Sequence, residues 1–160
     1  MLHDVYFALG SNLGDRKTNL QQALVRLGIG VEITQCSAVF DTKPVGNVRQ
    51  PRFLNMVCAG RTALSPQELL EFVKKIEADV GRKPGPVNGP RLIDIDILFY
   101  DDIVINTSRL VIPHPRIAER VFVLLPLFDI APEIKHPVSG RTVREMLHEL
   151  QWVSTDIIKL

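Results

Sequence analysis

Apolar and polar residues alternate over residues 92–99 in the pattern that a half-buried β-strand requires. Side chains on a strand point alternately to opposite faces, and a strand here places on one face Ile93, Ile95, Ile97 and Phe99. The other face carries Leu92, Asp94, Asp96 and Leu98. The two carboxylates then point the same way, with their Cβ atoms roughly 7 Å apart. An acid pair on a partly apolar face is therefore the first feature to explain.

The same kind of pattern predicts three earlier strands and two helices. Short apolar runs bounded by turn residues predict strands over residues 5–9, 31–40 and 53–59. Helical spacing predicts one helix that ends at Leu27 and a second that begins after the N-cap Ser65, with Pro66 at the first helical position and Glu68 completing a capping box. The segments 41–52 and 82–90 are rich in proline and glycine and are expected to be loops.

The predicted order β-α-β-β-α-β is typical of a ferredoxin-like α+β core, an antiparallel sheet with both helices on one face. C-terminal additions are expected to cover the other face: a short strand over 103–105, a helix near 117–121 and a last helix over 142–150. No internal repeat or linker divides the chain, so we expect a single domain over residues 1–160.

Composition narrows the class of protein. The chain has 160 residues, 46% of them hydrophobic, and a formal net charge of +1, which argues against a general nucleic-acid surface. Cys36 and Cys58 are isolated in apolar runs, and we expect both to be buried thiols. The N-terminus lacks the pattern of a signal peptide and no apolar run is long enough to span a membrane, so a cytoplasmic location is expected.

Asp94 and Asp96 suit hard divalent cations, which prefer carboxylate oxygens and leave positions open for water and phosphate. The alternative is an exposed sheet face with two solvated acids. Arg82 and Arg91 bracket the glycine- and proline-rich loop beside the pair, and arginine forks suit a phosphate chain. The alternative here is a surface loop whose basic residues are only solvated.

Two further positions are candidates for ligand contact. His114 is held between Pro113 and Pro115, and an imidazole there can donate to a phosphate oxygen, with Arg109 and Arg120 adding charge; a turn histidine without chemical function is the alternative. Asn55 lies in an otherwise apolar strand, and a buried amide needs partners such as a flat heterocycle supplies. Phe53 and Phe122 are candidate stacking rings, although plain core packing is the more common role of a phenylalanine.

Together these segments resemble one family, the 6-hydroxymethyl-7,8-dihydropterin pyrophosphokinases of folate biosynthesis. The matching pieces occur in the family's order: residues 10–14 (GSNLG), 42–46 (TKPVG), 53–55 (FLN), 76–77 with 81–82, 89–98 (GPRLIDIDIL), 112–114 (IPH) and 126–132 (PLFDIAP). Two departures are Asn88, where many members carry tryptophan, and Pro115, where an aromatic residue often follows the histidine.

The resemblance implies transfer of pyrophosphate from ATP to the hydroxymethyl group of the pterin, with release of AMP. Two Mg²⁺ ions are expected at Asp94 and Asp96. The residues implied for ATP are Arg82 and Arg91, both also catalytic candidates, with Glu77, Ile97, Arg109, His114 and Arg120. Those implied for the pterin are Thr42, Val45, Phe53, Asn55 and Phe122. The expected partners are these small substrates, with no nucleic acid or membrane, and the expected state is a monomer.

Two other functions fit the same predicted fold. A non-catalytic nucleotide-sensing module would bind ATP, but binding alone gives no reason for two acids beside a basic loop. An RNA-binding sheet needs exposed aromatic residues on central strands and a basic face, whereas this chain is near neutral with 6% aromatic residues.

Overall fold

The computed structural model describes residues 1–44, 49–81 and 92–160. Within these residues the main sheet has the strand order β5-β1-β4-β3-β8, and β2 also pairs with β4. All of these pairings are antiparallel. The strands are β1 (His3–Ser11), β2 (Glu32–Cys36), β3 (Phe40–Thr42), β4 (Phe53–Thr62), β5 (Asp94–Tyr100) and β8 (Ile157–Lys159). A separate hairpin consists of β6 (Ile105–Asn106) and β7 (Val111–Ile112).

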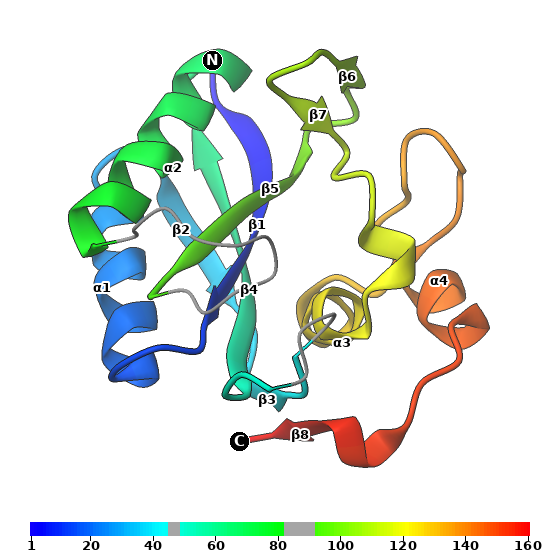
Figure 1. Cartoon of the computed structure of the whole chain (residues 1–160). Helices are drawn as coiled ribbons and strands as arrows, with labels where there is room; N and C mark the ends of the chain where they lie inside the picture. Colours follow the sequence, from blue (N-terminus) through cyan, green and yellow to red (C-terminus); the bar gives the residue numbers. More distant parts are fainter. Residues whose placement is uncertain (45–48, 82–91) are drawn as a thin grey trace.

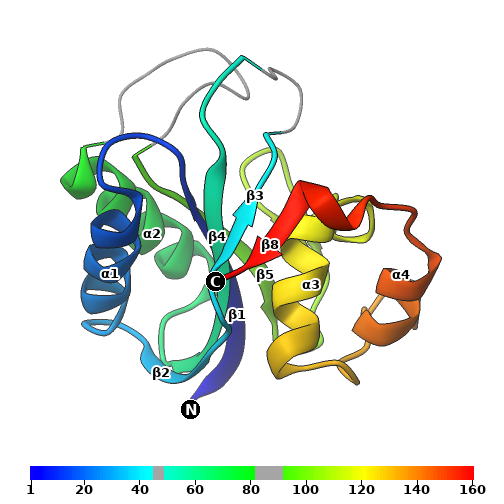
Figure 2. The same cartoon turned by 90° about the horizontal axis from the view of Figure 1, so that it is seen from below.

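Helices cover both faces of the sheet (Figures 1 and 2). The helices α1 (Arg16–Leu27) and α2 (Pro66–Val80) pack on one face over a core that includes Val5, Phe7 and Leu9 of β1. The helices α3 (Val121–Ile130) and α4 (Val143–Glu149) pack on the other face, over Tyr6, Ala8 and Val57. The predicted ferredoxin-like core is confirmed, and the C-terminal additions do cover the second face.

The single strand predicted over residues 31–40 is wrong, because β2 and β3 are separate strands that both pair with β4. The break lies at Ser37. Its hydroxyl accepts a hydrogen bond from the Val57 N–H at 2.9 Å, in a position where a continuous ladder would use a backbone carbonyl. A local side-chain bond of this kind has no counterpart in an apolar pattern, which explains why the pattern did not reveal the break.

The predicted face of Phe99 is also wrong. The pairing of β1 with β5 shifts register between Tyr6 and Phe7, so that Tyr6 lies opposite Phe99 and Phe7 lies opposite Ile97. The extra residue, Leu98, forms a bulge, which turns Phe99 to the α3 side of the sheet. Ile93, Ile95 and Ile97 pack on the α1–α2 side as predicted.

The C-terminal region differs from the prediction in detail. Residues Ile117–Glu119 form a single 3₁₀ turn, and the helix that follows, α3, extends from Val121 to Ile130 with Pro126 inside it. Because α3 is almost entirely apolar, its sequence has no helical periodicity to detect. The edge strand β8 was not predicted either.

Two composition-based expectations have mixed outcomes. Cys58 is buried, as expected, and burial raises the pKa of its thiol. Cys36, however, is exposed, because β2 lies at an open side of the sheet with most of its side chains in solvent. In the described parts of the chain, no helix is both long and apolar enough to cross a bilayer.

The predicted capping box of α2 is present and gives a test of local stability. Ser65 accepts a hydrogen bond from the Glu68 N–H, and Glu68 accepts one from the Ser65 N–H. We expect Ser65→Ala to lower the free energy of unfolding by about 1 kcal/mol, since the Glu68 N–H loses its partner, the Ser65 hydroxyl. Urea denaturation would measure this change. Ser108→Ala, at an exposed serine outside any helix, is the matched control, and an equal loss there would contradict the capping role.

Candidate functional site

The register of the central strand β1 brings the acid pair and Asn55 onto one face of the sheet. Gly10 lies opposite Asn55 on β4 and opposite Asp94 on β5. One step along the same face, Ala8 lies opposite Val57 and Asp96. Since directly paired residues share a face, Asn55, Asp94 and Asp96 all project toward the side covered by α3. Three chain segments thus meet at one surface.

An imidazole, that of His114, and a guanidinium, that of Arg120, approach Asp96 from the α3 side. His114 Nε2 lies 3.9 Å from Asp96 Oδ2, and Arg120 Nη1 lies 4.0 Å from the same oxygen. The carboxyl group of Asp96 is 43% exposed, whereas the side chains of His114 and Arg120 are largely covered. Asp96 is thus partly accessible to solvent and lies beside fixed donors that can reach an anion.

The backbone around His114 determines which imidazole nitrogen faces the acid pair. The His114 N–H donates to the Leu98 carbonyl at 3.1 Å, which fixes the residue against β5. Its Nδ1 accepts the Arg116 N–H at 3.2 Å, so the neutral ring carries its proton on Nε2, the atom that faces Asp96. Burial, followed by the charges of Arg120 and Arg116, lowers the pKa of His114 to about 4. At neutral pH this residue is an uncharged donor.

Asn55 is positioned from two sides. Its Nδ2 donates to Thr42 Oγ1 at 2.6 Å, and both side chains are buried. Its Oδ1 lies directly over Gly10, where a Cβ atom would come within 2.6 Å of that oxygen. The bond to Thr42 orients the amide so that Oδ1 is the atom presented for a further donor. The glycine leaves the space that this orientation needs.

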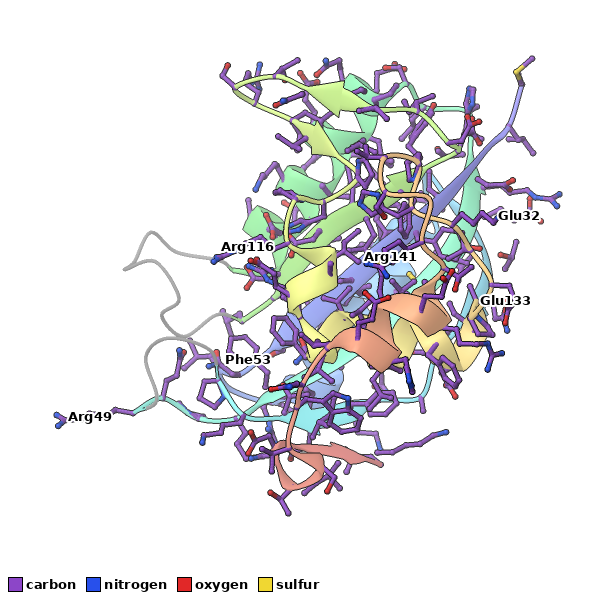
Figure 3. All side chains as sticks on the ribbon, turned by 90° about the vertical axis from the view of Figure 1, so that its right-hand side faces the viewer. Glu32, Arg49, Phe53, Arg116, Glu133 and Arg141 are labelled. Carbon is purple, nitrogen blue, oxygen red and sulfur yellow. The ribbon has the colours of Figure 1, made fainter. Side chains whose placement is uncertain are left out.

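The two predicted stacking rings come from different elements. Phe53 begins β4, and Phe122 is in the first turn of α3, where the Arg120 guanidinium lies 5.5 Å from the ring centroid. Figure 3 shows Phe53 and Arg116 on the same side of the molecule, with Glu32 and Glu133 on the opposite side. Phe53 thus lies on the same side of the molecule as Arg116, which is two residues after His114.

The residues predicted to lie near a nucleoside do not share the face of the acid pair. Glu77, at 3% exposure, accepts the Ile95 N–H at 2.9 Å through Oε2 and so joins the end of α2 to the edge strand β5. Ile97 packs into the core on the α1–α2 side. Arg109 is exposed in the loop that joins β6 to β7. Glu77 and Ile97 thus lie along β5 on the α1–α2 side rather than above Asp94 and Asp96.

Three of the predicted site residues, Val45, Arg82 and Arg91, fall outside the described residues. Among the residues that are described, no group of three or more His, Cys, Asp or Glu side chains gathers in a way that could hold a metal ion. A cation at Asp94 and Asp96 would have two carboxylates from this part of the chain. Mg²⁺ commonly binds in this way, with one or two carboxylates and substrate phosphates.

The sequence interpretation missed two contributors to this region. Gly10 was interpreted as part of a turn, whereas it is within β1 and adjoins Asn55. Gln50 received no role, yet its Oε1 accepts a hydrogen bond from Asn12 Nδ2 at 2.8 Å, in a buried contact between two loops. A glycine inside a strand pattern is a known signal for a close approach, and it was available for Gly10.

The state of His114 can be tested directly by its titration. We expect the imidazole of the metal-free protein to stay neutral down to pH values well below 6.5, its unperturbed pKa. Because the unfolded chain binds this proton first, His114 makes stability fall as pH decreases from about 6.5 toward 4. NMR of the imidazole nitrogens would follow the titration. Arg120→Ala should raise the pKa of His114, because a nearby positive charge is removed. A wild-type titration midpoint near 6.5 would contradict the buried position of His114.

The chain is similar to known proteins over most of its length. The family model for 7,8-dihydro-6-hydroxymethylpterin-pyrophosphokinase matches residues 6–132. A curated relative from Aquifex aeolicus, named 2-amino-4-hydroxy-6-hydroxymethyldihydropteridine pyrophosphokinase, is 44% identical over 145 residues, 91% of each chain. A Bacillus subtilis protein of the same name is 44% identical and covers 88% of this chain and 86% of its own length.

Longer relatives match only in part. The folic acid synthesis protein fol1 of Pneumocystis carinii is 41% identical over 91% of this chain, which spans 20% of that protein's length. A crystal structure of Plasmodium falciparum HPPK-DHPS superposes with a TM-score of 0.77 over 93% of this chain and 44% of that one. Its identity of 20% supports the fold alone. On the family match and the bacterial relatives, the chain belongs to the 7,8-dihydro-6-hydroxymethylpterin-pyrophosphokinase family.

Proposed function

We propose that this protein transfers pyrophosphate from ATP to the hydroxymethyl group of 6-hydroxymethyl-7,8-dihydropterin and releases AMP. The observation that supports this most is the register of β1, which sets Asn55 and Asp94 on either side of Gly10. An amide suited to a flat heterocycle and an acid pair suited to metal-bound phosphates thereby face one space. The names of the bacterial relatives agree with this reaction.

Asp94 and Asp96 are the proposed ligands of two Mg²⁺ ions. The pair fits these ions, because the carboxylates share a face and Asp96 is 43% exposed, which leaves room for water and phosphate oxygens. Bound Mg²⁺ would neutralise phosphate charge and lower the pKa of the attacking hydroxyl.

His114 and Arg120 are the proposed phosphate contacts from the α3 side. The Nε2–H of the neutral His114 ring can donate a hydrogen bond to a phosphate oxygen without adding a charge. Arg120 supplies positive charge. Arg82 and Arg91 are proposed to contact the phosphate chain and support catalysis, and both are outside the described residues. The nucleoside is proposed to lie along the edge strand β5, near Glu77, Ile97 and Arg109.

Asn55 is the proposed reader of the pterin edge, supported by Thr42 and by Val45. The Thr42 bond uses one of the two Nδ2 hydrogens, so Oδ1 remains as an acceptor and the second Nδ2–H as a donor for the pterin edge. Phe53 and Phe122 are proposed to enclose the ring from opposite sides. We also propose that the protein acts as a monomer in the cytoplasm.

In the proposed reaction, the pterin hydroxyl oxygen forms a bond to the β-phosphorus, the bond from that phosphorus to the bridging oxygen of AMP breaks, and the hydroxyl proton passes to solvent. Such a transfer depends on alignment and charge neutralisation, so no side chain has to act as a nucleophile. The chain contributes by holding both substrates in line and by excluding water, which would compete as an acceptor.

The deciding experiment is AMP release from ATP and Mg²⁺, with and without the pterin. Pterin-dependent AMP would support the proposal. ATP binding without AMP release would favour a nucleotide-sensing module on the same fold.

Replacement of either acid tests the metal assignment. We expect Asp94→Ala or Asp96→Ala to reduce turnover by about a thousandfold or more, since phosphate charge is no longer neutralised, and to change thermal stability little. Steady-state AMP release and thermal unfolding would measure the two effects. Asp102→Ala, at an exposed turn just after β5, is the matched control. Normal Mg²⁺-dependent activity in either variant would refute the assignment.

A methyl group at Gly10 tests the position of Asn55. We expect Gly10→Ala to displace the Asn55 amide, because the new Cβ would lie 2.6 Å from Oδ1, and to raise the KM for the pterin about tenfold. The free energy of unfolding should change only slightly, because the new methyl group displaces a side chain and not the backbone. Gly28→Ala, at a residue with helical dihedral angles remote from the site, is the control. An unchanged pterin KM would show that Asn55 does not need this position.

A further inference from the structure

The strand that carries Thr42, β3, is paired along both of its edges. On one side β3 pairs with β4, and on the other it pairs with the C-terminal strand β8, with Thr42 opposite Ile157. The Lys43 N–H donates to the Asp156 carbonyl at 2.8 Å, which extends this pairing beyond Thr42. Figure 2 shows β8 beside β3, away from α1 and α2. Residues 157–159 lie beyond the family match, which ends at residue 132.

Arg52 joins these elements through one guanidinium group. Its Nε donates to Asp41 Oδ1 at 2.6 Å, and its Nη2 donates to the carbonyls of Asp41 and Asp156, each at 3.1 Å. One planar side chain therefore binds a β3 carboxylate, a β3 carbonyl and a carbonyl next to β8. Lysine could not reproduce this set, because its ammonium group lacks the fixed fork of donors.

A neighbouring arginine reinforces the arrangement. Arg16, at the start of α1, donates from Nη1 to the Arg52 carbonyl at 2.9 Å and lies 3.8 Å from Asp41 Oδ2. Arg52 is thus held at both its backbone and its side chain. The Asp41 side chain is mostly covered, at 22% exposure, so its interaction with Arg52 is less screened than a surface ion pair.

This cluster lies behind the proposed pterin site rather than in it. Thr42 and Phe53 are paired and share a face with Asn55, whereas Asp41 lies between Phe40 and Thr42 and faces the opposite way. Arg52 follows Asp41 to that opposite side, where it also meets Arg16. It can influence a ligand at Asn55 only through the backbone of β3 and β4.

We propose that Arg52 is a positioning residue for the pterin, which acts with the C-terminal strand β8 to hold Thr42 and Asn55 in place. The inference rests on the proposed function, because it concerns the affinity for that substrate. If the β3 backbone loosens, Thr42 Oγ1 no longer orients the Asn55 amide, and the pterin loses a directed acceptor. The ATP side of the site, on β5 and around His114, does not depend on this cluster.

The test compares Arg52→Ala, Arg52→Lys and the wild type in steady-state assays. We expect Arg52→Ala to raise the KM for the pterin about tenfold, the change that loss of one hydrogen bond to a charged group commonly gives, with kcat and the KM for ATP nearly unchanged. Arg52→Lys should recover part of the lost affinity for the pterin. If the alanine variant does not fold, the KM of Arg52→Lys for the pterin is the deciding measurement. Arg61→Ala, which removes an exposed arginine from the far end of β4, is the matched control.

A double-mutant cycle separates positioning from general destabilisation. If Arg52 acts through Thr42, then the effects of Arg52→Ala and Thr42→Val on the pterin KM should be strongly non-additive, whereas a loss of global stability would affect both substrates. An active wild type with an unchanged pterin KM in both Arg52 variants would overturn this inference alone. A wild type without pterin-dependent AMP release would overturn the proposed function and this inference together.

Discussion

The arrangement of the whole site depends on how β1 pairs with its two neighbours. Because strand residues alternate faces, a shift of either pairing by one residue would turn Asn55 or both aspartates toward the opposite helices. The register is stabilised by burial: Val5, Phe7 and Leu9 pack against α1 and α2, while Tyr6 and Ala8 pack on the α3–α4 side. Hydrophobic packing on two faces thus determines which polar groups can meet.

Sequence patterns predicted the parts of the fold that depend on local regularity. The alternation around Asp94 and Asp96 was sufficient to predict the strand β5, and the capping box at Ser65 was sufficient to predict the start of α2. Both signals depend on a few adjacent residues. The C-terminal strand β8 was not predictable in this way. It has only three residues, two of them exposed, and exists because β3 offers it a free edge.

The candidate site was predictable as a set of residues but not as a geometry. Asn55, Asp94, Asp96, His114 and Arg120 do come together in the structure. The bulge at Leu98 and the placement of Arg52 behind the sheet arise from contacts between segments far apart in the chain. The preference of His114 for a proton on Nε2 follows from a single bond donated by the Arg116 N–H. A composition or spacing argument contains no information on such contacts.

The pairing of β1 with β5 also has a kinetic consequence. It joins Val5 to Tyr100, so most of the chain separates the two strands that place Gly10 opposite Asp94. Contacts between residues so far apart in sequence are slow to form, because a long loop must close before any of them is gained. We therefore expect the acid pair to take its place beside Asn55 late in folding. A ligand that needs both the acid pair and Asn55 would bind only chains in which β1 and β5 have paired. The onset of ligand binding during refolding would therefore report when this pairing forms.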